Sequence, residues 1–367
     1  MGHSTVFAAT VCAALLASAP PSTAEPGQES LGRTIDQVVT RVPACVGLAI
    51  GAIQGGVRVQ RFYGDAGNHR RPRPDTEFEI GSITKTLTAT LLAFEDSQGT
   101  MRLGDPLARY APPGFRVPNF NSQPIRLVHL AEHTSGLPRI VPQPTAPMSP
   151  ERLWRFIGTY QLQHAPGEQF LYSNLGFALL ARAIVRRSHE SEDQLYARVI
   201  TGPLGMPDTA IEMKPAQRPR LAQGFAPNGQ AAPAVEFVRG FPAMAGAGGA
   251  RSTLDDMMRY LDFELGWVDV PLRSLLPALQ GPRHAAGRNG SVGLGWQMHD
   301  DSNVRTIFKG GAVPGFSSYV AFAPSRGTGV VVLANQTRCA VQKIASQIMS
   351  ALNGANGQDL PVSDDEP

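Results

Sequence analysis

The chain has 367 residues, of which 42% are hydrophobic and 17% charged, as in an ordinary globular protein with one large domain or two lobes. Its formal net charge of +3 is small, and no basic run carries interleaved aromatic residues, so nothing supports nucleic-acid binding. Arginine supplies most of the positive charge, and the chain has only four lysines: Lys85, Lys214, Lys309 and Lys343.

The N-terminal residues have the pattern of a targeting segment. An apolar run at residues 6–16 is too short to span a bilayer, and small residues suited to signal peptidase follow it. No Lys or Arg precedes the run, and a helix buried in the fold is the alternative. We expect residues 1–24 to be a signal peptide and the mature chain to be periplasmic or secreted. No later run predicts a stable transmembrane span.

Strands are predicted near both ends of the chain and helices between them. Residues 46–53 and 57–62 form a β-hairpin around a Gln-Gly-Gly turn, and four more strands are expected at 294–298, 304–308, 316–322 and 330–334. Apolar residues recur at helical spacing in seven segments: 84–94, 125–132, 150–157, 175–187, 192–199, 254–264 and 341–352.

This order predicts an α+β fold whose antiparallel sheet is built from both ends of the chain, with flanking helices and an inserted helical region. One catalytic domain would span residues 25–353. Its sheet lobe would take about 40–80 and 290–353, and its helical lobe about 81–289. Residues 354–367 are polar, acidic at the end and expected to be disordered.

Two cysteines remain once the expected signal peptide, with Cys12, is removed. Cys45 precedes the first predicted strand and Cys339 follows the last. If those strands are antiparallel neighbours, both cysteines lie at the same end of the sheet and could form a disulfide. Two unrelated buried thiols are the alternative.

The strongest chemical signal is Ser82 followed by Lys85. Ser82 precedes an apolar-periodic run, so Lys85 lies on the same helical face, three residues later. A serine hydroxyl needs a base to become a good nucleophile, and a desolvated lysine can be that base whereas arginine cannot. A helix-capping serine followed by a solvated lysine is the ordinary alternative.

Two further segments favour the catalytic interpretation. Tyr172-Ser173-Asn174 leads into a predicted helix, where a phenol can share proton transfer and an amide can hold a substrate. Lys309-Gly310-Gly311 follows a predicted strand, and glycines there let a ligand approach the backbone. Each has an ordinary alternative, a core tyrosine beside a helix cap and a turn with a surface lysine.

Together these segments resemble the class C β-lactamases and the penicillin-binding proteins with D-alanyl-D-alanine carboxypeptidase or endopeptidase activity. Residues 78–86, 172–174 and 309–311 match the three active-site motifs of that family in order and spacing. Segments 105–110, 130–138, 203–206 and 293–296 match as well, so the similarity extends from about Cys45 to Gln336. Residues 110–118 and 172–174 favour the peptidase branch.

The resemblance implies roles for individual residues. Ser82 would be the nucleophile, and Lys85 and Tyr172 would share general-acid and general-base duty. Asn174 would bind the substrate amide and Lys309 its carboxylate. The N–H groups of Ser82 and Ala312, which follows Gly311, would form the oxyanion hole. It implies no metal or other cofactor, peptidoglycan peptides or β-lactams as substrates, and no particular oligomeric state.

Two departures from the family pattern leave other activities open. Gly310 stands where the family usually has threonine, and Arg139-Ile140 stands where class C enzymes have a glutamine shortly after Gly-Leu-Pro. A β-lactamase proper, an esterase of the same fold and a penicillin sensor without turnover are therefore alternatives to the peptidase.

His129-x-x-Glu132-His133 also spells the inverted zinc-protease pattern, because two histidines at i and i+4 could face one metal. We favour the reading in which His133 fixes a loop by hydrogen bonding, because the resemblance already accounts for this segment.

Overall fold

The computed structural model describes residues 1–2, 26–141, 147–232, 241–287, 290–301, 304–354 and 360. All but the first two residues of the expected signal peptide lie outside the described residues, as does most of the tail after Gly354. Leu360 departs from the expected disorder. It is buried, and its N–H donates to Ser346 Oγ at 3.0 Å.

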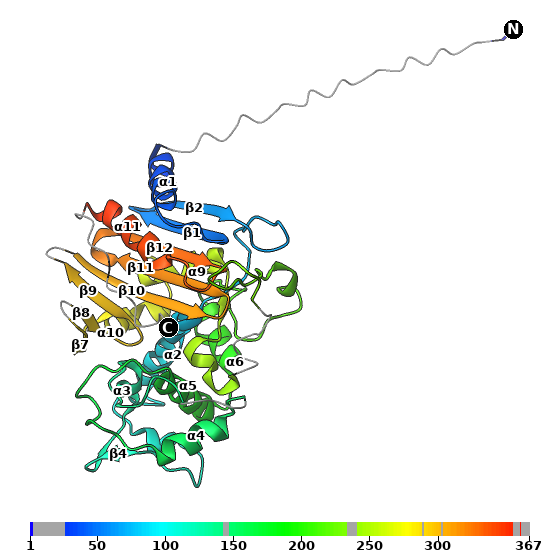
Figure 1. The fold of residues 1–367 in the computed structure, drawn as a ribbon. Coiled ribbons are helices and arrows are strands. Elements are labelled where there is room, and N and C mark those ends of the chain that lie inside the picture. Colours follow the sequence, from blue (N-terminus) through cyan, green and yellow to red (C-terminus); the bar gives the residue numbers. More distant parts are fainter. Residues whose placement is uncertain are drawn as a thin grey trace.

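Within the described ranges, one eight-stranded sheet runs in the order β2-β1-β12-β11-β10-β9-β8-β7, and its printed pairs are all antiparallel (Figure 1). As expected, the first strand pairs with the last, with Ile50 opposite Val332. In chain order the strands are β1 Gly47–Gln54, β2 Val57–Gly64, β7 His284–Ala285, β8 Gly290–Val292, β9 Gln297–Asp301, β10 Val304–Val313, β11 Phe316–Ala323 and β12 Thr328–Ala334.

Both faces of the sheet are buried, and alternate residues of each strand serve two cores. On β12, Val330 and Val332 pack with the two terminal helices, α1 Pro26–Val39 and α11 Val341–Asn353. Val331 and Leu333 pack into the larger core on the helical side. This explains why the central strands read as continuous apolar runs rather than alternating ones.

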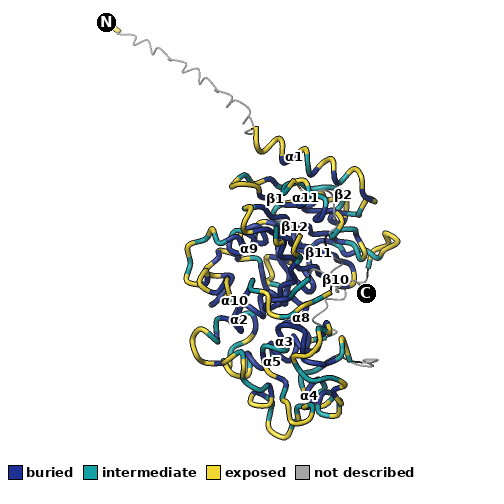
Figure 2. The backbone as a smooth tube through the Cα atoms, turned by 90° about the vertical axis from the view of Figure 1, so that its left-hand side faces the viewer, coloured by how far each residue is buried: buried dark blue, intermediate teal, exposed yellow. Residues whose placement is uncertain are grey.

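The helical region covers the second face. In Figure 2 the buried colour follows the sheet and the central helices, and exposed residues follow the outer loops. The main helices and the two small hairpins here are β3 Phe78–Glu79 with β6 Arg251–Ser252, β4 Asn119–Phe120 with β5 Gln123–Pro124, α2 Thr84–Gln98, α3 Leu127–Ala131, α4 Pro150–Thr159, α5 Asn174–Ser188, α6 Glu192–Tyr196, α8 Ala245–Gly248, α9 Leu254–Glu264 and α10 Leu276–Gln280.

Some boundaries differ from the sequence prediction. β9 begins at Gln297 instead of residue 294, because Gly295 turns with φ 77° and its N–H donates to Ala131 O in the helical region. α3 begins at Leu127 instead of 125, since Ile125 O accepts a hydrogen bond from Leu107 N outside the helix. None of the helices in the described ranges is both long and apolar enough to cross a membrane.

Cys45 and Cys339 are joined by a disulfide, with their Cα atoms 5.6 Å apart. The antiparallel pairing of β1 and β12 brings the start of one strand beside the end of the other. The disulfide therefore ties together two parts of the chain that are 294 residues apart in sequence.

Candidate active site

Ser82 lies in a single 3₁₀ turn, Gly81–Ile83, that leads directly into α2. The turn follows strand β3, which pairs with β6, and a buried ion pair between Arg251 and Glu79 (3.1 Å) joins the two strands. The side chain of Ser82 is only partly accessible, at 7% exposure for the residue. The nucleophile candidate is therefore held at the mouth of a buried helix.

Lys85 lies one turn into α2 and is fully buried. Its Nζ donates to Ser82 Oγ at 2.7 Å and to the carbonyl oxygen of Ala247 at 2.6 Å. The first contact is the one expected from the three-residue spacing. The second was not expected, and it fixes the ammonium between α2 and α8.

Small residues allow α8 to approach so closely. A Cβ added at Gly246 would lie 2.3 Å from Ala181 Cβ on α5, and Gly246 O accepts a hydrogen bond from Thr88 Oγ1 on α2. The Ala-Gly run at residues 245–250 was the available sequence signal for this contact, because such a run permits close backbone packing.

Tyr172 reaches the same place from the segment before α5. Its hydroxyl lies 3.4 Å from Lys309 Nζ, and its ring centroid lies 4.6 Å from that Nζ and 5.1 Å from Lys85 Nζ. Residues from α2, the segment before α5 and β10 therefore meet within a few ångströms. The structure brings Ser82, Lys85, Tyr172 and Lys309 together.

His133 holds the segment that carries Tyr172. Its backbone oxygen accepts from Leu171 N (2.7 Å) and its Nδ1 accepts from Ser173 N (3.0 Å), while its ring stacks on Tyr172. Burial lowers the pKa of His133 well below its usual value, and the charges of Lys309 and Lys85 lower it further. A neutral ring accepting at Nδ1 carries its proton at Nε2.

The zinc interpretation of this segment fits the geometry poorly. His129 Nδ1 accepts from Arg126 N at 3.2 Å, and Glu132 lies 3.8 Å from the guanidinium of Arg283. Across the part of the chain that the structure describes, no three His, Cys, Asp or Glu side chains are grouped to hold a metal ion.

Strand β10 brings its free edge to the nucleophile. Its pairing with β9 ends at Phe308, and residues 309–313 contact the turn of Ser82 instead. A Cβ added at Gly311 would lie 2.1 Å from Ile80 O and 3.0 Å from Ser82 N. A Cβ added at Gly81 would lie 2.7 Å from Ala312 N. Both glycines are thus required for the N–H groups of Ser82 and Ala312 to lie near each other.

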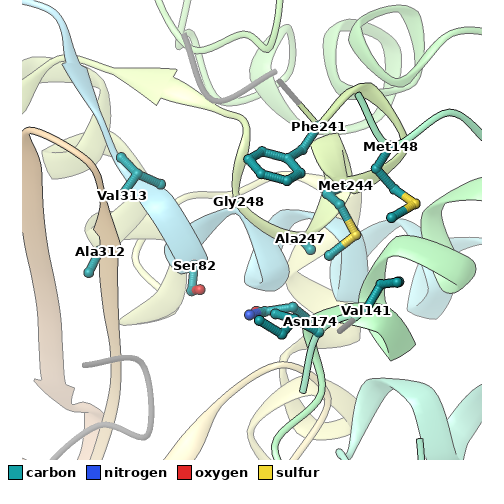
Figure 3. A pocket seen from close by; sticks show the side chains of 11 residues that line it. Ser82, Val141, Met148, Asn174, Phe241, Met244, Ala247, Gly248, Ala312 and Val313 are labelled. Atoms are coloured by element: carbon teal, nitrogen blue, oxygen red, sulfur yellow. The ribbon is translucent and has the colours of Figure 1, made fainter. Parts of the chain in front are cut away.

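Asn174 is the first residue of α5, and its backbone N–H donates to Arg139 O at 3.0 Å. Its side chain lines the same pocket as Ser82 (Figure 3). The exposed Arg139 places its guanidinium carbon 5.0 Å from the Tyr172 ring centroid. It therefore adds a third cation around the phenol, a feature that was not predicted from the sequence.

The chain shows similarity to proteins of one family. Residues 35–348 match the family described as Beta-lactamase. The D-alanyl-D-alanine-carboxypeptidase/endopeptidase AmpH of Escherichia coli K12 is 34% identical over 92% of this chain and 92% of its own length. A beta-lactamase of the same strain is 29% identical over 95% of this chain and all of its own length.

Solved structures show the same fold. A Yersinia pestis protein described as beta-lactamase/D-alanine carboxypeptidase, complexed with citrate, superposes with a TM-score of 0.75 at 28% identity. It covers 88% of this chain and 99% of that one. A class C beta-lactamase superposes with a TM-score of 0.79 at 21% identity, covering 91% and 99%.

Together with the meeting of a buried lysine, a serine and a tyrosine, these matches identify the chain as a serine hydrolase that belongs to the β-lactamase family.

Proposed function

We propose that the chain is an exported hydrolase that cleaves D-Ala-D-Ala-type peptides of peptidoglycan, and reacts with β-lactams, through an acyl-enzyme on Ser82. The observation that carries this proposal is the pair of contacts at the helix mouth, Lys85 Nζ to Ser82 Oγ at 2.7 Å and Lys309 Nζ to Tyr172 OH at 3.4 Å. The relationship to AmpH supports the peptidase as the principal activity.

Acylation begins when Ser82 Oγ attacks the carbonyl carbon of the penultimate D-alanine. The Lys85–Tyr172 pair takes the serine proton and returns a proton to the leaving nitrogen as the C–N bond breaks. The N–H groups of Ser82 and Ala312 stabilise the negative oxygen of the tetrahedral intermediate. Water then attacks the ester carbonyl, releasing the acyl group and restoring the serine hydroxyl.

Binding uses the edge of the sheet and the lysine beside it. An extended peptide can hydrogen-bond to a free strand edge, and residues 309–313 of β10 offer such an edge next to Ser82. Lys309 attracts the terminal carboxylate that every D-Ala-D-Ala peptide carries, and Asn174 holds the amide on the acyl side. Because Gly310 supplies no hydroxyl, Lys309 and Arg139 would provide the carboxylate recognition between them.

Mass spectrometry tests the proposal directly. After incubation with benzylpenicillin the intact mass should rise by that of one penicillin, and peptide mapping should place the adduct on Ser82. A pentapeptide ending in D-Ala-D-Ala should lose its terminal D-alanine. Ser82→Ala should abolish both reactions, whereas Ser97→Ala, on the exposed C-terminal part of α2, should leave them unchanged.

Two outcomes would contradict the proposal. A penicillin adduct on a different residue would exclude Ser82 as the nucleophile. A single round of acylation without any release of D-alanine would favour a sensor over a hydrolase.

A further inference from the structure

A pocket of about 170 Å³ opens beside Ser82, and its composition is unusual for a site that handles charged peptides (Figure 3). Of its lining side chains in the described part of the chain, only Ser82 and Asn174 are polar. None of them carries a charge. The pocket therefore differs in character from the surroundings of Tyr172, where three cations gather.

The apolar walls are fixed parts of the fold. Figure 3 shows Phe241, Met148 and Met244 on one side of the opening and Val313 on the other, with Ser82 between them. Met148, Met244 and Val313 are buried. Ala247 and Gly248, which also line the pocket, have little or no side chain, so the space is left open.

Charge decides which part of a substrate can enter this pocket. The leaving group of a D-Ala-D-Ala peptide carries a carboxylate, and burying an unpaired ion among apolar side chains is strongly unfavourable. Lys309, which would bind that carboxylate, does not line the pocket. The leaving group therefore belongs on the Lys309 side, and the pocket is left for the acyl side of the bond.

Size sets a second limit. An apolar cavity of about 150 Å³ takes up one benzene molecule. The pocket beside Ser82 is of similar volume, so it has room for a methyl group, a short alkyl chain or a single aromatic ring.

We propose that this pocket is the subsite for the side chain of the acyl donor. It selects donors with an apolar group no larger than one ring and rejects donors with a charge at that position. The inference rests on the proposed function, since the pocket is a donor subsite only if Ser82 accepts the acyl group. The charged parts of a natural stem peptide would then stay outside, with the D-alanyl methyl directed inward.

Two penicillins that differ by one carboxylate test this selectivity. Benzylpenicillin and α-carboxybenzylpenicillin share the ring and the β-lactam, so the ratio of their Ser82 acylation rates isolates the charge. We expect benzylpenicillin to react at least 10-fold faster. Activated esters of phenylacetic acid and of phenylmalonic acid repeat the comparison without the β-lactam ring.

Variants assign the preference to the pocket. Met244→Lys should lower the benzyl-to-carboxybenzyl ratio by at least 10-fold, and Met244→Leu should keep it. Val141→Lys, at a half-exposed position on the pocket wall, makes the same test if Met244→Lys does not fold, as judged by its melting temperature.

The outcomes separate the two proposals. Equal acylation rates for both penicillins on Ser82, or an unchanged ratio in both folded lysine variants, would overturn the apolar subsite and leave the proposed function standing. Absence of any adduct or ester cleavage at Ser82 would overturn both.

Discussion

The imidazole of His133 stacks on the phenol ring of Tyr172, with ring centroids 4.2 Å apart and ring planes inclined by 29°. His133 itself adopts a left-handed backbone conformation with φ 58°, which is uncommon for a residue other than glycine. This conformation lets one residue accept hydrogen bonds from both Leu171 and Ser173, on either side of the tyrosine. His133 is thus a positioning residue for Tyr172.

His133→Phe keeps a ring beside Tyr172 but removes the acceptor for Ser173 N–H. Leaving that buried N–H unpaired should cost about 1–3 kcal/mol of unfolding free energy. A small displacement of Tyr172 should also lower kcat for D-alanine release by about 10- to 100-fold, with KM changed little. His129→Phe is the matched control, because it also removes an acceptor for a backbone N–H, that of Arg126. It should lose stability and keep kcat, and an equal loss of kcat in both variants would exclude a positioning role.

Tyr172→Phe removes only the hydroxyl next to Lys309. Because the phenol is assigned to proton transfer, the second-order rate of acylation should fall by about 10²- to 10⁴-fold. The ring would keep its stacking on His133, so the melting temperature should change by a few degrees at most. Stopped-flow acylation by a chromogenic β-lactam provides the rate, and a loss of less than threefold would remove Tyr172 from the catalytic set.

Gly311→Ala should be far more damaging than its size suggests. The added methyl would collide with Ile80 O and press on Ser82 N, so the turn that carries the nucleophile must move. We expect a loss of about 1–3 kcal/mol in stability and at least a 100-fold loss in kcat/KM. Gly104→Ala provides the comparison, since a Cβ there meets no atom within 4 Å. Normal activity in Gly311→Ala would show that the approach of β10 to Ser82 is not needed.

Glu77 gives the fold a measurable pH dependence. Burial raises the pKa of this carboxyl from 4.5 to about 8, and the nearby Asp208 carboxylate adds to the increase. Between those pH values the folded state keeps a proton that the unfolded state has released. The stabilisation is therefore present at low pH and lost as pH rises through this window.

Glu77→Gln cannot ionise and should remove this loss. Urea unfolding from pH 5 to 9 should show the wild type losing up to about 1.4 kcal/mol per pH unit relative to the variant within the window. Near pH 5 the two proteins should differ least, because both side chains are then uncharged. A gap that is constant across the range would mean that Glu77 is ionised throughout.

The disulfide should contribute strongly to stability. Closing a loop of 294 residues lowers the entropy of the unfolded chain, which stabilises the fold by about 5 kcal/mol on the loop-entropy scale. Reduction, or the double replacement of Cys45 and Cys339 by alanine, should lower the melting temperature by 10 °C or more. Intact mass after alkylation checks the oxidation state. An unchanged melting temperature after full reduction would show that sheet pairing alone holds the termini together.

The sequence was sufficient to predict the features that depend on short-range patterns. Ser82 and Lys85 are three residues apart, and that spacing on a helix determines their contact directly. The strands of the sheet centre were evident because apolar runs near Ile50 and Val332 are bounded by turn residues. The antiparallel pairing of the first and last strands followed from a sheet built from both ends of the chain.

Features that depend on tertiary contacts could not be predicted in this way. The carbonyl of Ala247 binds Lys85 across a sequence distance of 162 residues, and a backbone oxygen leaves no mark in the sequence. Likewise, Met148, Phe241 and Met244 look like ordinary core residues until the fold directs them to one opening. The early end of the β9 pattern was missed because the contact of Gly295 with α3 is equally remote.

The pairing of β1 with β12 also affects how the chain can be made. Strand β1 is synthesised about 280 residues before its partner, so at 5–20 residues per second it waits roughly 15–60 seconds for β12. During that interval its hydrogen-bonding edge and apolar side chains have no native partner on one side. The completed sheet can form only near the end of translation, which leaves a long period in which a translocation machine or a chaperone could bind the unfolded chain.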